Sequence, residues 1–106
     1  MPNKRILKII NELNKLIREQ FGDFKGLYLY GSQVKGNRHK DSDIDLVAVF
    51  DEVSREKTFE IAGILCDLEY KYDIYIDLHE YTEKDLQRNP YYYNEVVNKG
   101  IYYEAA

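Results

Sequence analysis

Tryptophan is absent from this chain of 106 residues, while cysteine and methionine occur once each and proline twice. The single cysteine, Cys66, excludes an intramolecular disulfide and favours a reducing compartment, so we expect a cytoplasmic protein. No apolar run approaches the roughly 20 residues that span a bilayer, and the N-terminus lacks a signal-peptide pattern. Neither a membrane protein nor a disulfide-stabilised secreted domain is therefore expected.

Basic residues are fewer than acidic ones, with 15 Lys and Arg against 19 Asp and Glu, and the formal net charge is -4. Binding along a nucleic acid requires concentrated Lys and Arg, so the composition argues against a nucleic-acid partner. Lys35, Arg38 and Lys40 nevertheless occur close together, either as a solvated loop or as a local anion site. The hydrophobic fraction of 44% and the length suit one globular domain over residues 1–106.

Apolar spacing divides the chain into alternating helices and strands. The expected elements are a helix over 3–21 capped by Asn3, a strand over 25–30, a brief helix over 31–35, a strand over 43–50, a long helix capped by Ser54, a strand over 73–80, a short helix after Thr82 and a last helix over 91–99. This order predicts an α/β domain with a small mixed β-sheet flanked by helices.

Two sets of apolar side chains bear on how the helices pack. We expect the long helix after Ser54 to bury a broad apolar side made of Phe59, Ala62, Cys66, Ile61, Leu65 and Leu68. The tyrosines of the C-terminal 16 residues have two readings: they cover a small core, or they form an interface with a partner or a second copy of the chain. Both readings stay open.

The main chemical signal is a Gly-Ser pair after the first strand and an Asp-x-Asp pair at the start of the second. Gly31 lets the backbone approach a phosphate, Ser32 adds a hydroxyl donor, and Gly36 allows a tight return. Asp43 and Asp45 leave the same face of a strand, so both can reach one divalent ion. Magnesium prefers such oxygen ligands together with phosphates, and the chain offers no Cys/His set for structural zinc.

A third carboxylate is expected on the neighbouring strand. Asp77 is the favoured candidate because a bare charge in the middle of a strand needs a partner such as a metal or a hydroxyl, whereas Asp73 lies at the strand edge. His79 is placed on the face opposite Asp77 and is expected to be structural. His39 is expected to be a loop residue rather than a base.

The chain resembles the minimal nucleotidyltransferases of the DNA polymerase β superfamily in the sequences YGSQVKG at 30–36 and DSDIDL at 41–46. The resemblance implies that Gly31 and Ser32 bind a nucleoside triphosphate such as ATP, with Lys35, Gly36 and Arg38 nearby. It implies that Asp43, Asp45 and Asp77 bind one or two Mg²⁺ ions. Gln33 departs from the family, whose members often carry Arg after the Gly-Ser pair.

The resemblance also implies a partner. Small members of this family are commonly paired, as antitoxins, with a helical toxin called HEPN, and some transfer AMP from ATP to a tyrosine of that toxin. The alternative is a binding module that neutralises its partner without catalysis. Nucleotidyl transfer to a small molecule is a third option, which the short segment after Asp77 argues against because it leaves little protein to hold an acceptor.

Overall fold

The computed structural model describes residues 2–36 and 43–106, so Arg38, His39 and Lys40 of the predicted phosphate loop lie outside the described residues. The described elements are α1 (Lys4–Gln20), β1 (Phe24–Tyr30), the 3₁₀ helix η1 (Gly31–Lys35), β2 (Ile44–Phe50), α2 (Arg55–Tyr72), β3 (Ile76–Tyr81), α3 (Glu83–Gln87), α4 (Pro90–Tyr93), the π-helical turn η2 (Asn94–Asn98) and β4 (Ile101–Glu104). No helix among the described residues is both long and apolar enough to cross a membrane.

The four strands form one mixed sheet in the order β3-β2-β1-β4. Strand β1 runs antiparallel to both β2 and β4, and β2 runs parallel to β3. The predicted mixed sheet is therefore confirmed, but the sequence reading missed β4. This edge strand has only four residues. Its pairing with β1, which places Gly26 opposite Glu104, joins segments far apart in the sequence, and local sequence patterns do not report such a contact.

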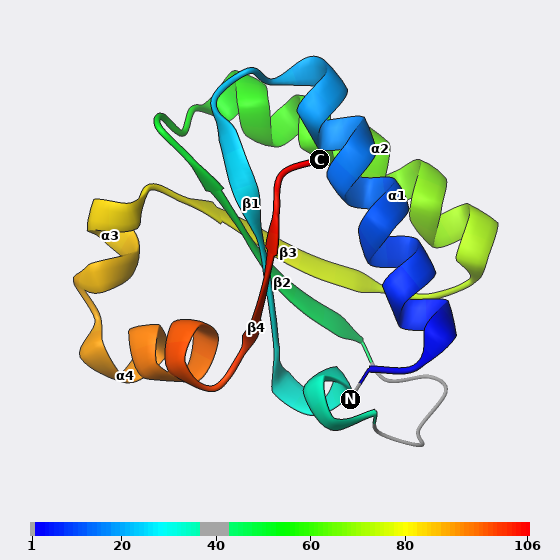
Figure 1. Ribbon diagram of the computed structural model, residues 1–106. Coiled ribbons are helices and arrows are strands. Elements are labelled where there is room, and N and C mark those ends of the chain that lie inside the picture. The colour runs from blue at the N-terminus through cyan, green and yellow to red at the C-terminus, as the bar shows by residue number, and fades with distance from the viewer. Residues whose placement is uncertain (1, 37–42) are drawn as a thin grey trace.

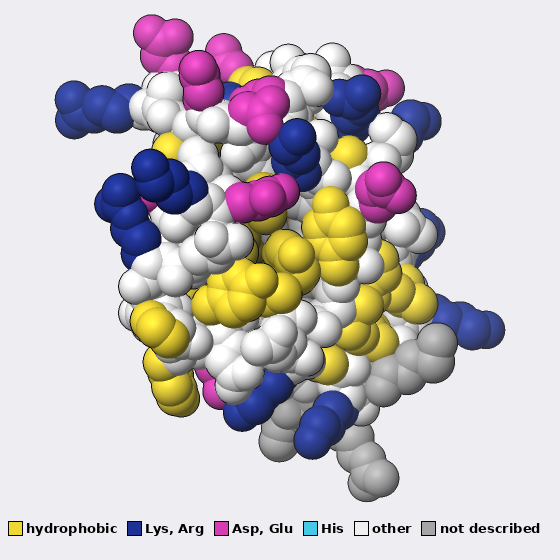
Figure 2. Space-filling view, turned by 60° about the vertical axis from the view of Figure 1, so that its left-hand side comes forward, with side chains coloured by type: hydrophobic (Ala, Val, Ile, Leu, Met, Phe, Trp, Pro, Cys, Tyr) yellow, Lys and Arg dark blue, Asp and Glu magenta, His cyan; other side chains and the backbone are white. Residues whose placement is uncertain are grey.

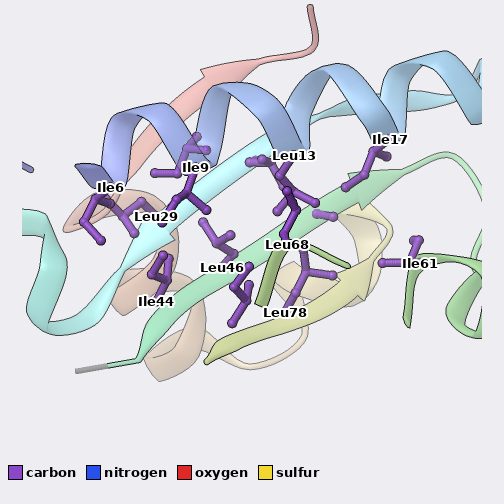
Figure 3. Close-up of a cluster of buried hydrophobic side chains, with 14 of the residues drawn as sticks. Ile6, Ile9, Leu13, Ile17, Leu29, Ile44, Leu46, Ile61, Leu68 and Leu78 are labelled. Carbon is purple, nitrogen blue, oxygen red and sulfur yellow. The ribbon is translucent and has the colours of Figure 1, made fainter. Parts of the chain in front are cut away.

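Helices α1 and α2 cover one face of the sheet, and α3 and α4 lie on the other side (Figure 1). Helix α1 begins where the Asn3 side chain accepts a hydrogen bond from the Ile6 backbone N–H, as predicted. Its buried residues recur every three or four positions, so they form one stripe that faces the sheet. Figure 3 shows this stripe pointing at strand residues; the labelled helix and strand side chains include Ile6, Ile9, Leu13, Ile17, Leu29, Ile44, Leu46 and Leu78.

Helix α2 corrects one prediction about packing. Ser54 caps it, and Ile61 and Leu68 are buried against the core, but Phe59 is 81% exposed, and Cys66 is exposed as well. At 3.6 residues per turn, the Ile61 stripe and the Phe59 stripe lie on opposite sides of one helix. A single sheet face can cover only one of these stripes. The prediction that Phe59 and Cys66 are buried together with Ile61 and Leu68 is therefore wrong.

The second face of the sheet carries a smaller core that depends on tyrosines. Val47, Val49, Leu86 and Val96 are buried there, and partly buried tyrosines pack against them, among them Tyr28, Tyr30, Tyr81, Tyr92 and Tyr93. Figure 2 shows hydrophobic side chains, tyrosines included, gathered on this side with charged side chains around them. Some C-terminal tyrosines thus cover a small core. Tyr91 is 76% exposed, so it is available for an interface with a partner or a second copy of the chain.

Candidate functional site

The Gly-Ser bend lies directly against one of the paired aspartates. Tyr30, the last residue of β1, is the register partner of Asp45 in β2, and Gly31 follows it with φ of 78°. A Cβ atom at Gly31 would overlap Asp45 Oδ2, so any other residue type would displace this carboxylate as well as strain the backbone. The Gly-Ser bend and the Asp45 side chain therefore lie against each other in the structure.

The acids from two strands lie side by side. Asp45 and Asp77 are register partners in the parallel pair β2–β3, and neighbouring strands are about 4.8 Å apart. Asp43 comes immediately before β2 and shares the face of Asp45 because successive side chains alternate. Burial raises the pKa of Asp45, and the nearby carboxylates of Asp77 and Asp43 raise it further. The neighbouring carboxylates thus place negative charge around the half-buried side chain of Asp45.

The structure separates the two candidates for the third carboxylate. Asp73 is the C-cap of α2, with φ of 51° in the left-handed region, and it lies before β3 rather than in it. Strand β3 begins at Ile76, later than the sequence predicted, so Asp77 is its second residue instead of a central one. Only Asp77 of these two is a register partner of Asp45, so the geometry favours Asp77 in the site.

The prediction that His79 lies on the face opposite Asp77 is wrong. Its Nε2 atom lies 3.2 Å from Asp77 Oδ1, and the His79 side chain is 52% exposed. Residues two apart on a strand share a face, and this spacing was the signal that the sequence reading overlooked. His79 acts in the opposite sense to the carboxylates, because its charge lowers the pKa of Asp45. It is therefore part of the same cluster.

A cavity of about 470 Å³ adjoins the bend, lined by Gly31, Ser32, Val34, Lys35, Glu95 and Lys99. Lys35 was predicted near the phosphates, whereas Glu95 and Lys99 were not, since nothing in the sequence joins η2 to the bend. Gly36 has φ of 71°, and its N–H donates to the Gln33 carbonyl at 3.2 Å, which gives the tight return expected of it. Gln33 itself is buried, where the family often has Arg.

A tyrosine pair borders the acids on the side of the smaller core. Tyr30 and Tyr92 join their hydroxyl groups at 2.9 Å, with ring centroids 5.7 Å apart in an edge-to-face arrangement. Burial raises the pKa of Tyr30, and Asp45 and Asp77 add to that rise. The two hydrogen-bonded, neutral tyrosine side chains therefore lie beside the carboxylates of Asp45 and Asp77.

Within residues 2–36 and 43–106, no three His, Cys, Asp or Glu side chains form a ready-made metal cluster. The residues nevertheless fit Mg²⁺ held jointly with a triphosphate, because that ion needs only one or two carboxylates when phosphates and waters complete its shell. The crowding that raises the pKa of Asp45 is what a divalent cation would relieve. Asp43, Asp45 and Asp77 are the candidate ligands.

Comparison with known proteins gives the family. Residues 5–103 match the model of the nucleotidyltransferase domain. The Methanocaldococcus jannaschii protein named "Putative protein adenylyltransferase MJ1379" is 28% identical over 97 residues, which are 92% of this chain and 93% of that protein.

Solved structures of toxin–antitoxin complexes share the fold. One, of a mutant of the toxin–antitoxin MntA-HpeT, has a TM-score of 0.65 at 23% identity over 91% of this chain and 72% of the other. Another holds AMP-PNP, with a TM-score of 0.63 at 23% identity over 90% and 69%. A third contains a tri-AMPylated Shewanella oneidensis HEPN toxin with its MNT antitoxin, with a TM-score of 0.60 at 20% identity over 91% and 69%. The chain belongs to the nucleotidyltransferase domain family, and its fold is that of the minimal nucleotidyltransferases.

Proposed function

We propose that this nucleotidyltransferase domain transfers AMP from ATP to a hydroxyl group of a partner protein, most simply a tyrosine of a HEPN-type toxin. The observation that carries the proposal is the contact between the Gly31 bend and Asp45, together with the pairing of Asp45 and Asp77. A phosphate-sized bend and a cluster of carboxylates at one end of a sheet suit a triphosphate and its metal.

The phosphates and the metal are assigned to different residues. We propose that the phosphates are held by Gly31, Ser32, Lys35, Gly36 and Arg38, of which Arg38 lies outside the described residues. Bound Mg²⁺ would neutralise phosphate charge and stabilise charge on the attacking and leaving oxygens.

Asp43 and Asp45 would orient the α-phosphate through that ion. The Asp77 carboxylate would accept the proton of the acceptor hydroxyl, because Asp77 lies on the side of β3, across Asp45 from the Gly31 bend. The residues that bind the phosphates and the residue that receives the proton thus lie on opposite sides of Asp45.

Names and descriptions of similar proteins support this choice of acceptor. The M. jannaschii relative is named as an adenylyltransferase acting on protein, and one structural neighbour pairs an MNT antitoxin with an AMPylated HEPN toxin. A second neighbour contains the ATP analogue AMP-PNP. These statements concern those proteins, and they make the same donor and acceptor the first to test here.

The test is to mix the protein with a HEPN-type partner, ATP and Mg²⁺ and to measure intact masses. We expect the partner to gain the mass of one or more adenylyl groups, with tyrosine as the modified residue in fragment spectra. The double variant Asp43→Asn/Asp45→Asn is the matched control and should leave the partner unmodified. Unmodified partner with the wild-type protein would contradict the proposal.

A second candidate function, neutralisation by binding alone, has one observation in its favour. The outer side of α2 exposes Phe59, 81% accessible, beside an open groove of about 580 Å³ that Val53, Thr58 and Ala62 also line. Exposed apolar surface of this kind is typical of protein interfaces. If the double Asn variant forms the same complex as the wild type and masses stay unchanged in both, binding without catalysis is the function.

A further inference from the structure

The cavity beside the Gly31 bend has two lysines that come from distant parts of the chain. Lys35 ends η1, directly after the bend, and Lys99 follows η2 near the C-terminus. The cavity measures about 470 Å³, within the range of small-molecule sites. Two cationic side chains and one carboxylate, Glu95, line it, so its chemistry suits an anion with several charged oxygens.

Lys99 is held in place by the backbone around it. Its N–H donates to the Asn94 carbonyl at 3.0 Å, closing the π-helical turn. A Cβ atom at the next residue, Gly100, would lie 2.1 Å from the Val96 carbonyl oxygen and 2.6 Å from that of Leu29. Only glycine permits this approach, and Leu29 is two residues before Gly31. The turn that carries Lys99 is therefore fixed against the end of β1.

The Lys99 ammonium is accessible, and its ion pair with Glu95 is exposed to solvent. Its Nζ lies 2.9 Å from Glu95 Oε1, and the two side chains are 64% and 35% exposed. Exposed pairs at this helical spacing contribute little to stability because water screens them. A phosphate with greater negative charge can therefore displace Glu95 as the partner of Lys99 at small cost.

We propose that Lys99 is a further cationic contact of the two terminal phosphates of a nucleoside triphosphate held at the Gly31 bend, and that these phosphates replace Glu95 as its partner. The proposal rests on the proposed function and adds to it two residues of this chain, Lys99 as a phosphate contact and Glu95 as its exchangeable partner. In the sheet order β3-β2-β1-β4, the acids lie on β2 and β3, whereas Lys99 immediately precedes the turn into β4. The Gly31 bend lies between them.

This arrangement gives the transfer a direction. In a phosphoryl-type transfer, the attacking and leaving oxygens lie roughly in line on opposite sides of phosphorus. A bond forms between the acceptor oxygen and the α-phosphorus, and the bond from that phosphorus to the oxygen bridging to the β-phosphate breaks. Pyrophosphate leaves with the electron pair into the Lys99 cavity, while the acceptor proton passes to Asp77. The acceptor therefore enters over β3.

The experiment is calorimetry in Mg²⁺ with three probes: an ATP analogue that cannot be cleaved at the α–β linkage, pyrophosphate and AMP. We expect Lys99→Ala to weaken binding of the analogue and of pyrophosphate about tenfold, as loss of one charge-assisted contact does, and to leave AMP binding unchanged. Glu95→Gln should act in the opposite sense and tighten analogue binding a few-fold, because it removes the competing carboxylate. Lys99→Arg should bind close to the wild type.

The matched control is the Lys25–Asp51 ion pair, 3.2 Å long and exposed, at the opposite end of β1 from Gly31. Lys25→Ala makes the same change of net charge and should not alter binding of any probe. Thermal unfolding of every variant separates lost binding from lost folding. If Lys99→Ala and Glu95→Gln change stability equally and leave analogue affinity unchanged, the pair is only a helix contact and the subsite is wrong.

Failure of the proposed function is distinguishable from failure of the subsite. Wild-type protein that binds no triphosphate contradicts both, because no donor is then held anywhere. Wild-type binding of the analogue with unchanged affinity in Lys99→Ala contradicts the subsite alone. Equal weakening of AMP and the analogue by Lys99→Ala also overturns it, because the contact would then not be to the terminal phosphates.

Discussion

The two ends of the β1–β2 pair treat charge in opposite ways. At one end, Lys57 Nζ lies 3.0 and 2.8 Å from the two oxygens of Asp23, donates to the Glu52 carbonyl at 2.6 Å and lies 4.4 Å from the Phe50 ring centroid. At the other end, Asp45 faces the carboxylates of Asp77 and Asp43. At the first end the charges are paired and contribute to the stability of the fold. At the second end the carboxylates repel one another, and a bound cation that also holds phosphates would relieve this repulsion.

The largest expected effect comes from removing charge at the repulsive end. Asp43→Asn/Asp45→Asn should reduce nucleotidyl transfer by about a thousandfold or more, in the range that loss of a charge-stabilising group costs a catalyst. The same variant should unfold at an equal or higher temperature, because the repulsion that raises the pKa of Asp45 is gone. Transfer assays measure the loss of activity, and thermal unfolding measures the change in stability. A marked loss of stability would contradict the claim that the carboxylates repel one another at this end.

Closing the space between the bend and the acid should have the next largest effect. Gly31→Ala places a Cβ where Asp45 Oδ2 now lies, at a φ of 78° that disfavours side chains. We expect loss of about 1–3 kcal/mol of stability, as for other strained backbone positions, and binding of ATP too weak to measure by calorimetry. Gly63→Ala is the control, since nothing lies within 4 Å of a Cβ there. Wild-type ATP affinity in Gly31→Ala would show that the bend does not act with Asp45.

At the compensated end, the same kind of change should act on stability instead of activity. Asp23→Asn should cost about 1–2 kcal/mol of unfolding free energy, because it leaves the ammonium of Lys57, only 11% exposed, with fewer charged partners. Nucleotide affinity should not change. Urea unfolding measures the first quantity and calorimetry the second, and an unchanged unfolding midpoint would contradict this assignment.

The same pair predicts a pH dependence. Burial acts to raise the pKa of Asp23, but hydrogen bonds from Lys57 and from the Glu52 N–H outweigh it, so the pKa lies below the usual 3.8. A carboxyl with a lowered pKa contributes stability above its unfolded pKa and loses it as pH falls through the folded value. The stability difference between wild type and Asp23→Asn should thus be constant near neutrality and shrink below about pH 4.

The smallest effect is expected at His79, which contacts Asp77 at 3.2 Å from an exposed position. His79→Ala should lower Mg²⁺-dependent ATP affinity or transfer only a few-fold, because exposed charged pairs contribute little and Asp77 keeps its own place in β3. His79→Asn, which keeps a hydrogen-bond donor, should restore part of the loss. A hundredfold loss in His79→Ala would mean that the histidine contacts a substrate directly.

The sequence was most informative where a physical rule acts locally. The caps at Asn3 and Ser54, the stripe of α1 and the Gly31 bend all follow from short spacings, and the structure has each of them. Alternation along a strand also placed Asp43 and Asp45 on one face.

What the sequence did not indicate depends on contacts between distant segments. Strand β4 exists because it pairs with β1, and Lys99 reaches the bend only because Gly100 packs against Leu29. The exposed side of α2 follows from how much of a helix one sheet can cover, which the apolar count of α2 alone does not report. His79 was a different kind of error, since the two-residue spacing already put it beside Asp77.

The central claim is that the acids on β2 and β3 and the Gly31 bend act together on a metal-bound triphosphate. The most direct measurement is calorimetric titration of a non-hydrolysable ATP analogue, with and without Mg²⁺, into wild-type protein and into Asp45→Asn/Asp77→Asn. The account predicts binding to the wild type that requires Mg²⁺ and is abolished in the double variant while the fold is retained. Equal binding in both proteins, or binding indifferent to Mg²⁺, would contradict it.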